Sequence, residues 1–264
     1  MQNEAYIRLG FFFGVLAVMA LWELAAPRRR LTMSKSVRWM SNLSLTFLNT
    51  FLVRAAIGLM GIKLAFLAAD HNWGILSAFD MPFPLAGIIS IIALDFIIYI
   101  QHVLFHMLPL LWRLHKMHHV DLDIDVTTGA RFHPVEILIS IGIKMATIVA
   151  LGAPPWAVVT FEVLLNATAM FNHANAFLPV GLDRILRLFV VTPDMHRVHH
   201  SVIIRETNSN YGFNLPWWDR LFGTYIPQPS RGHLDMKIGL ANYRDPKKNT
   251  LPWMLIIPFL GKER

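Results

Sequence analysis

With 264 residues, of which 55% are hydrophobic and only 16% charged, the chain is too apolar for an ordinary water-soluble domain. Its formal net charge of +7 comes from scattered Lys and Arg residues without an aromatic stacking platform, which favours an anionic membrane surface over nucleic acid as a partner. The absence of cysteine excludes disulfides, iron–sulfur centres and thiolate metal ligands.

Three apolar stretches near the start of the chain are predicted to form membrane-spanning helices. The first, residues 7–25, is about long enough to cross a bilayer. It lacks the basic leader and the small-residue cleavage site of a signal peptide, so we expect it to be retained. The second, residues 43–69, contains Arg54 and Lys63 and fits less well, whereas the third, residues 84–108, holds a single acidic residue.

Two further apolar stretches, residues 135–151 and 156–171, are joined by the turn-forming sequence GAPP and predict a helical hairpin. Antiparallel packing would place Lys144 and Glu162 at similar depth. Because an isolated charge in the membrane is costly, we expect the two side chains to pair. The alternative is that both face water. The chain is therefore predicted to have about four to five membrane-embedded helices.

The Lys and Arg residues of the connections set the expected orientation. Residues 26–42 contain five of them, whereas residues 70–83 contain none. The first connection is therefore expected in the cytoplasm, which places the N-terminus outside and the end of the third span back on the cytoplasmic side.

Nine of the twelve histidines form a pattern that predicts a metal site. The spacing His-x-x-His-His occurs twice, in HKMHH and HRVHH, and residues three and four apart project from one face of a helix, so each triplet is expected to converge on one point. Neutral imidazoles suit iron, zinc, copper or nickel, and nine exceed the coordination of one ion, so two metals are expected. The nine are His102, His106, His115, His118, His119, His173, His196, His199 and His200. His71 and His233 lie outside the pattern and are expected to be solvated.

Polar residues near the histidines are candidates for orienting the ligands. Asp95, two helical turns before His102, either orients a ligand imidazole through an intermediate group or, as we expect, pairs with Arg54. In the sequence TTGARFHPVE, His133 is a candidate ligand or supporting residue, and Glu136 follows it where the chain re-enters the membrane.

The later sequence SNYGFNLPWWDRLFGTY is dense in polar and aromatic residues. It can brace the last histidine triplet, with Asp219 or Asn210 accepting an imidazole N–H. Alternatively it is an interfacial anchor, because Trp and Tyr favour the headgroup region.

The order and spacing of these motifs resemble those of the membrane-bound fatty acid hydroxylase superfamily, which includes sterol desaturases, methylsterol oxidases and alkylglycerol monooxygenases. The matching sequence segments lie within about residues 95–225 and are LDFIIYIQHVLFH, LWRLHKMHHV, TTGARFHPVE, FNHAN and TPDMHRVHHSVIIRETNSNYGFNLPWWDRLFGTY. The resemblance implies an all-α integral membrane protein. Residues 1–94 would form N-terminal transmembrane helices, and residues 95–264 a histidine-box domain with a membrane hairpin and a cytosolic helical cap.

The resemblance further implies that the nine histidines hold two iron ions in the active enzyme, with zinc as the occupant of a purified or inactive form. Some members of the superfamily have two histidines around the intermediate position, where this chain has only His173, followed by Asn175. Either water, Asn175 or His133 fills that place, or one metal keeps an open position.

The implied activity is O2-dependent hydroxylation or desaturation of a lipid: a fatty acyl chain, a sterol or an ether lipid. No cytochrome, flavin or Gly-rich dinucleotide motif is apparent, so we expect electrons from a separate protein or a small reductant such as a pterin. Candidate residues for lining a lipid cavity are Trp112, Phe132, Phe171, Phe177 and Phe213.

Three other classes fit the sequence less well. A membrane zinc-dependent hydrolase, the main alternative, normally has a carboxylate beside the metal-bound water, and no His-Glu-x-x-His occurs in the sequence. A metal transporter would carry its ligands near the membrane midplane. A carboxylate-type diiron centre would contain Glu-x-x-His, which is also missing.

Overall fold

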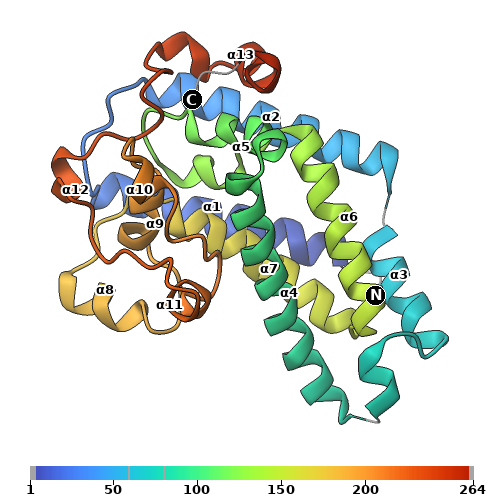
Figure 1. The fold of residues 1–264 in the computed structure, drawn as a ribbon. Coiled ribbons are helices and arrows are strands. Elements are labelled where there is room, and N and C mark those ends of the chain that lie inside the picture. Colours follow the sequence, from blue (N-terminus) through green and yellow to red (C-terminus); the bar gives the residue numbers. More distant parts are fainter. Residues whose placement is uncertain (1–3, 59, 80, 262–264) are drawn as a thin grey trace.

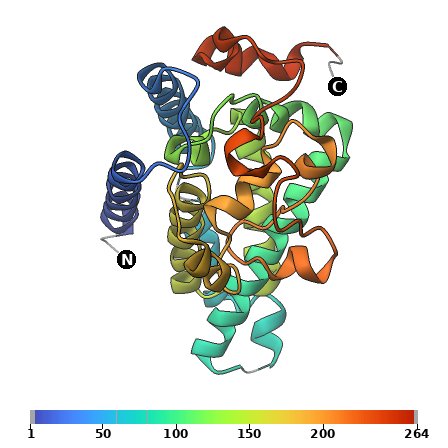
Figure 2. The same ribbon diagram turned by 90° about the vertical axis from the view of Figure 1, so that its left-hand side faces the viewer.

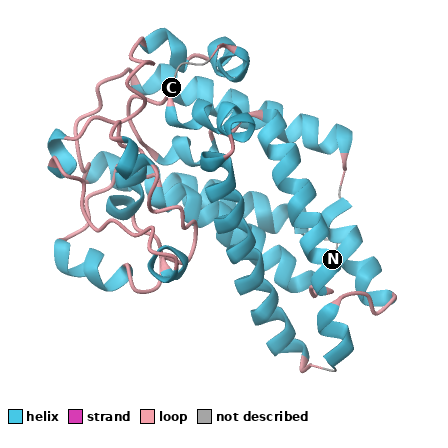
Figure 3. Cartoon of the chain, viewed as in Figure 1, coloured by secondary structure: helices cyan, strands magenta, loops and turns pink. Residues whose placement is uncertain are grey.

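The computed structural model describes residues 4–58, 60–79 and 81–261, and within these ranges the chain is helical, with no strand (Figure 3). This confirms the predicted all-α fold. The longer helices are α1 (Glu4–Ala25), α2 (Lys35–Ala56), α3 (Met60–Asp70), α4 (Phe83–Met107), α5 (Pro109–His119), α6 (Pro134–Leu151) and α7 (Pro155–Asn172). The shorter helices are η1 (Ile75–Phe79), η2 (Val126–Ala130), α8 (Val180–Leu186), α9 (Pro193–His199), α10 (Ile204–Thr207), α11 (Trp217–Leu221), α12 (Gly232–Asp235), η3 (Pro246–Asn249), α13 (Leu251–Ile256) and η4 (Ile257–Phe259).

The long helices form a bundle, and the short helices α8 to α12 gather with their loops at one end of it (Figure 1). We call this end the cap. Within the bundle, α7 packs against α1, α3 and α4, while α6 packs against α3 and α4. Figure 2, in which the cap faces the viewer, shows α1 at an outer edge of the bundle. The cap therefore closes one end of an otherwise elongated helical body.

Three helices in the described ranges are long and apolar enough to cross a membrane: Tyr6–Ala25, Phe83–Met107 and Pro134–Leu151. The pair Lys35–Ala56 and Gly61–Phe79 adds a fourth if the two helices, bent by 41°, count as one broken span. The predicted second span is thus interrupted, and α7 is not among the candidate spans. The helices that can cross a membrane number three, or four with the bent pair.

The predicted turn between α6 and α7 is built on Gly152. This residue caps α6 in the left-handed conformation, with φ of 70°, which favours glycine because it has no Cβ atom. Lys144, before the turn, and Glu162, after it, form the predicted ion pair, with Lys144 Nζ 2.5 Å from Glu162 Oε1. Arg8 of α1 contacts the other carboxylate oxygen, also at 2.5 Å. Three helices are therefore joined by charge within the bundle.

A buried charge network fixes the loop that follows α5. Arg38 of α2 donates from Nε and Nη2 to the two oxygens of Asp121, at 2.9 and 2.8 Å, and its Nη1 donates to Asp125. All three side chains are inaccessible to solvent. Although burial acts in the opposite direction, the guanidinium lowers the pKa of Asp121. Asp123 accepts hydrogen bonds from the backbone N–H groups of residues 32 and 33, both at 2.8 Å. The loop is thereby tied to the connection between α1 and α2.

We expect Arg38→Leu to lower the free energy of unfolding by about 3–5 kcal/mol, because it leaves Asp125 buried without its cation and Asp121 with only Arg131, 3.9 Å away. Thermal unfolding of the protein purified in mild detergent measures the change. The matched control is Arg30→Leu, which removes an exposed arginine from the same connection. Equal melting temperatures for the two variants would contradict the role assigned to Arg38.

Candidate metal centre

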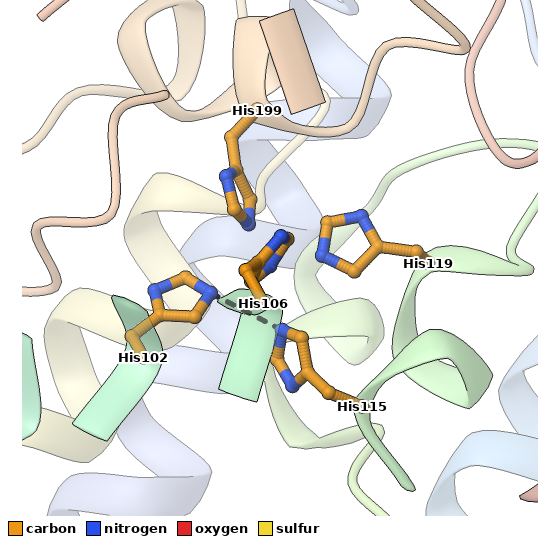
Figure 4. Close-up of side chains that lie close together, drawn as sticks. All are labelled: His102, His106, His115, His119 and His199. Carbon is orange, nitrogen blue, oxygen red and sulfur yellow. Dashed lines mark hydrogen bonds between the residues drawn. The ribbon is translucent and has the colours of Figure 1, made fainter. Parts of the chain in front are cut away.

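Five histidines from three helices converge on one point (Figure 4). We call them the first histidine group. His102 and His106 come from α4, His115 and His119 from α5, and His199 from the end of α9. Each offers one ring nitrogen, and these nitrogens all lie within 4.8 Å of one another. A single ion between α4, α5 and α9 could therefore contact all five rings.

Four further histidines form a second histidine group, with the same limit of 4.8 Å between their ligand atoms. His118 comes from α5, His173 follows α7, and His196 and His200 come from α9 and its C-cap. The Nε2 atom of His173 lies 3.2 Å from that of His118 and 3.0 Å from that of His196. The structure thus brings together all nine histidines of the sequence pattern.

Each His-x-x-His-His triplet is divided between the two groups, so the expectation that a triplet converges on one point is wrong. His115 and His119 point into the first group and His118 into the second, while His196 and His200 share the second group and His199 joins the first. Adjacent helical residues are about 100° apart around the axis, whereas residues four apart are offset by only about 40°. One helix can therefore serve two neighbouring centres.

The two groups lie side by side. The ring centroids of His119 and His200, which belong to different groups, are 4.7 Å apart, and those of His118 and His119 are 5.3 Å apart. Because α5 and α9 supply histidines to both groups, a movement of either helix would disturb both groups together.

Six of the nine rings are oriented by a hydrogen bond from Nδ1, at 2.6 to 3.2 Å. An acceptor beside Nδ1 favours the tautomer protonated there and leaves the lone pair of Nε2 available to a metal. The pairs are His102 with Tyr211 O, His106 with Asn208 Oδ1, His115 with Glu136 Oε1, His118 with Arg131 O, His173 with Ala169 O, and His199 with Ser209 O.

Burial favours the neutral form of six histidine rings at or near α5, α7 and α9. Burial lowers the pKa of His173 to about 4. Burial, followed by the neighbouring imidazoles, lowers the pKa well below its usual value for five further rings: His118, His119, His196, His199 and His200. Neutral imidazole is the form that binds metals, so these rings need not lose a proton at pH 7.

The unpaired nitrogens of the two groups fit a bound cation. The Nε2 atoms of His119, His199 and His200 are buried without a hydrogen-bond partner, although buried polar atoms are normally paired. With metal–nitrogen distances of roughly 2.0–2.1 Å, ligands on opposite sides of an ion lie about 4 Å apart, in keeping with the spread of each group. Both groups consist of imidazole alone, a donor set that suits iron, zinc, copper or nickel better than magnesium or calcium.

Of the predicted supporting residues, Glu136 contacts a ligand candidate directly, at 2.6 Å from His115 Nδ1. His133 instead caps α6, accepting from the N–H of Val135 and donating to the carbonyl of Leu255, each at 3.3 Å. His133 belongs to neither histidine group, and the side chain of Asn175 is engaged with the backbone of Arg29.

Asp95 does not pair with Arg54 as expected. Its Oδ2 accepts from Trp218 Nε1 at 2.8 Å and from the N–H of Leu215 at 3.3 Å, while Oδ1 accepts from the N–H of Asn214 at 3.3 Å. The folded cap brings these N–H donors to α4. Asp95 therefore anchors residues 214–218 to the span that carries the first histidine pair.

Asp219 and Asn210 support the ligands indirectly rather than by accepting an imidazole N–H. Asp219 accepts from the N–H groups of Tyr211 and Gly212, both at 2.8 Å. Asn210, whose φ is 50°, donates to the carbonyls of Met195 and Ile226. These bonds shape the loop whose carbonyls, at residues 209 and 211, accept from two histidines of the first group.

Two features were missed or misread in the sequence. The acidic residues of HKMHHVDLDIDV hold the loop that leads to Arg131. The carbonyl of Arg131 in turn accepts from His118. The alternating acidic residues of DLDID could have predicted this loop from the sequence. His233 is buried rather than solvated; it donates to Gln228 Oε1 at 2.9 Å and lies 3.5 Å from Asp194. Burial lowers the pKa of His233 to about 4. The residues next to His233 in the sequence do not predict its contact with Asp194 of α9.

A cavity of about 600 Å³ reaches the first histidine group between α1, α2, α4, α6 and α7. His102 and His115 line it together with Phe132 and Phe213, two of the predicted lining residues. The other predicted lining residues lie outside this wall: Trp112, Phe171 and Phe177. Most of the wall is apolar, so the cavity suits a hydrocarbon chain.

Comparisons with known proteins agree with this site. The family model "Fatty acid hydroxylase" matches residues 87–224, which contain all nine histidines. An ornithine lipid hydroxylase, OlsE, of Rhizobium tropici is 27% identical over 232 residues, covering 86% of this chain and 69% of that protein. The alkylglycerol monooxygenase of Xenopus tropicalis is 28% identical over 165 residues, covering 61% of this chain and 35% of that protein.

Sphinganine C4-monooxygenase 1 of Arabidopsis thaliana is 29% identical over 145 residues, covering 52% of this chain and 53% of that protein. No solved structure matches the chain. The family match spans half of the sequence and includes every histidine of both groups. The chain therefore belongs to the fatty acid hydroxylase family of membrane proteins.

Proposed function

We propose that the protein is a membrane-bound, O2-dependent oxidoreductase that hydroxylates or desaturates a lipid, with two iron ions held by the nine histidines. The observation that carries this proposal is the pair of adjacent imidazole-only groups, the first of which borders an apolar cavity through His102 and His115. The relatives support it, because their names describe lipid hydroxylases and monooxygenases. The substrate is a lipid with a fatty acyl, sterol or alkyl ether chain.

Two iron ions with dioxygen would supply an oxidant able to attack an unactivated C–H bond. The chain's own part is to hold the ions and the substrate carbon in place. The Nδ1 hydrogen bonds fix the direction of six ligand rings. Phe132 and Phe213, which line the cavity beside His102 and His115, would hold an alkyl chain against the first histidine group and exclude water.

We further propose that the histidine groups lie on the cytoplasmic side, with the N-terminus outside. The basic connection between α1 and α2 supports this orientation by the positive-inside rule. Electrons would come from a separate donor protein or a small reductant on the same side.

Iron content tests the proposal directly. We expect protein purified in mild detergent from cells grown with iron-57 to contain about two irons per chain, with a coupled signal in its Mössbauer spectrum. Addition of dioxygen, reductant and a lipid panel should then give an oxidised lipid, identified by mass spectrometry. Zinc alone, persisting after iron reconstitution and with no oxygen consumption, would favour the hydrolase instead.

His118→Ala and His199→Ala each remove a ligand from a different group, so each should lower iron content from about two toward about one per chain and abolish lipid oxidation. Elemental analysis of the purified variants measures the loss. The exposed His71 provides the control, because His71→Ala should keep both iron and activity. The same iron content in all three variants would refute the ligand assignment.

Glu136→Gln tests whether the carboxylate that orients His115 affects metal binding, while His115 itself stays in place. It weakens the acceptor that faces His115 Nδ1 and should lower metal affinity by about 10–100-fold, as measured by competition with a chelator. Asp235→Asn alters an exposed carboxylate of α12 and should leave the affinity unchanged. Equal affinities for the two variants would show that Glu136 does not act through His115.

A further inference from the structure

Helix α8 of the cap carries charged side chains on its buried face and apolar side chains on its exposed face. Asp183 and the C-cap residue Arg187 are buried and ion-paired, with Nε 2.7 Å from Oδ2. Leu182 and Ile185 are exposed, and Phe189, just beyond the helix, is 62% exposed. A helix at an aqueous surface has the opposite arrangement, with its apolar stripe toward the core. The exposed face of α8 therefore suits an apolar medium better than water.

Helix α11 repeats this inverted arrangement. Asp219 is fully buried, whereas Leu221 is 70% exposed and Phe222, the C-cap residue, is 53% exposed. Together the two helices and the residues that end them present six exposed apolar side chains. We call these the cap patch: Leu182, Ile185, Phe189, Trp217, Leu221 and Phe222.

The two halves of the cap patch belong to one surface. Trp217 Nε1 donates to the carbonyl of Leu188 at 2.7 Å, and Arg220 Nη2 donates to the carbonyl of Arg187 at 3.0 Å. Both helices lie on the same side of the cap (Figure 1). A large contiguous apolar surface of this kind usually contacts a membrane or another protein.

The contacts between α11 and α4 set the depth of the cap patch. The ring of Phe96 lies 4.7 Å from that of Trp218 and 5.8 Å from that of Phe222, between centroids. With 25 residues, α4 is about 37 Å long, whereas the hydrocarbon core of a bilayer is about 30 Å thick. A membrane-crossing α4 can therefore extend beyond the hydrocarbon by only about 7 Å. Phe96 precedes the end of α4 by about 16 Å, so α11 packs against it at hydrocarbon depth.

The exposed charges beside the cap patch are all positive. In residues 180–190 and 215–225 both carboxylates, those of Asp183 and Asp219, are buried, while Arg184 and Arg220 are exposed. Arginines that flank an apolar face match the anionic headgroups that lie above the hydrocarbon. A second copy of the chain fits less well, because a symmetric contact would bring the same arginines together.

We propose that the cap patch is inserted into the leaflet on the cap's side of the membrane. The cap is then partly embedded through α8 and α11, with Arg184 and Arg220 at the headgroups. This inference goes beyond the proposed function, because it requires neither metal nor oxidation. Insertion would hold in the membrane the same segment that Asp95 anchors to α4.

Nitroxide labelling tests the proposal, because the chain contains no cysteine and single cysteines can be labelled selectively. Phe189→Cys and Leu221→Cys, in the full-length protein, are labelled and placed in nanodiscs of phosphatidylcholine and phosphatidylglycerol. Electron paramagnetic resonance measures collisions with O2, which concentrates in hydrocarbon, and with a water-soluble nickel chelate. The ratio of O2 to nickel collisions should exceed that of Asp235→Cys, an exposed position of the same cap, by about tenfold or more, since hydrocarbon excludes the polar chelate.

Ile88→Cys supplies the membrane reference, because this side chain is 52% exposed on α4. Ratios at the two patch positions equal to that at Asp235→Cys would place the cap patch in water and overturn the proposal. Low collision rates with both reagents would show that a protein covers the cap patch, which would overturn it as well.

The unmodified chain allows a second measurement that does not depend on the folding of labelled variants. Phosphatidylcholine with a photoreactive diazirine in its acyl chain should crosslink to residues 180–189 and 217–222 as well as to α4. Peptide mass spectrometry identifies the crosslinked segments. Crosslinks to α4 but to neither segment of the cap would contradict the insertion.

Discussion

The need to aim nine mostly buried imidazoles at two points governs the rest of this structure. A buried imidazole is costly unless both nitrogens find partners, and here six rings donate from Nδ1 to carbonyl, carboxylate or amide oxygens. Those acceptors come from four regions: the end of α7, the loop before α6, the first turn of α6, and the loop between α10 and α11. The cap is therefore shaped by the acceptors that the histidines require.

Buried charge holds those acceptors in place. Arg38 joins α2 to the acidic loop after α5, and that loop ends at the carbonyl that accepts from His118. Asp219 and Asp95 play corresponding parts for the loop between α10 and α11, since both accept from its backbone N–H groups and Asp95 also accepts from Trp218 of α11. Each carboxylate satisfies several donors at once, which offsets the cost of its burial. The long helices and the cap are thus coupled through the site.

The sequence predicted those features that depend on local spacing or on charge within an apolar stretch. The long apolar helices α1, α4 and α6 follow from length and hydrophobicity, and the pair of Lys144 with Glu162 follows from their distances to one turn. The break after α2 was not predicted, although Arg54 and Lys63 made this stretch a poorer span, because Gly58, with φ of 62°, is only one of two glycines in it. Continuous hydrophobicity does not by itself show where a helix bends.

The sequence by itself determined which nine histidines gather and that the fold is helical, because helical periodicity and imidazole chemistry are written in residue types and their spacing. Only the tertiary structure decided how each triplet divides between two groups, because that depends on where α4, α7 and α9 approach α5. It also decided the partners of Asp95 and His233, which lie more than a hundred and about forty residues away along the chain, respectively. Such contacts depend on packing between elements, for which one sequence carries no local signal.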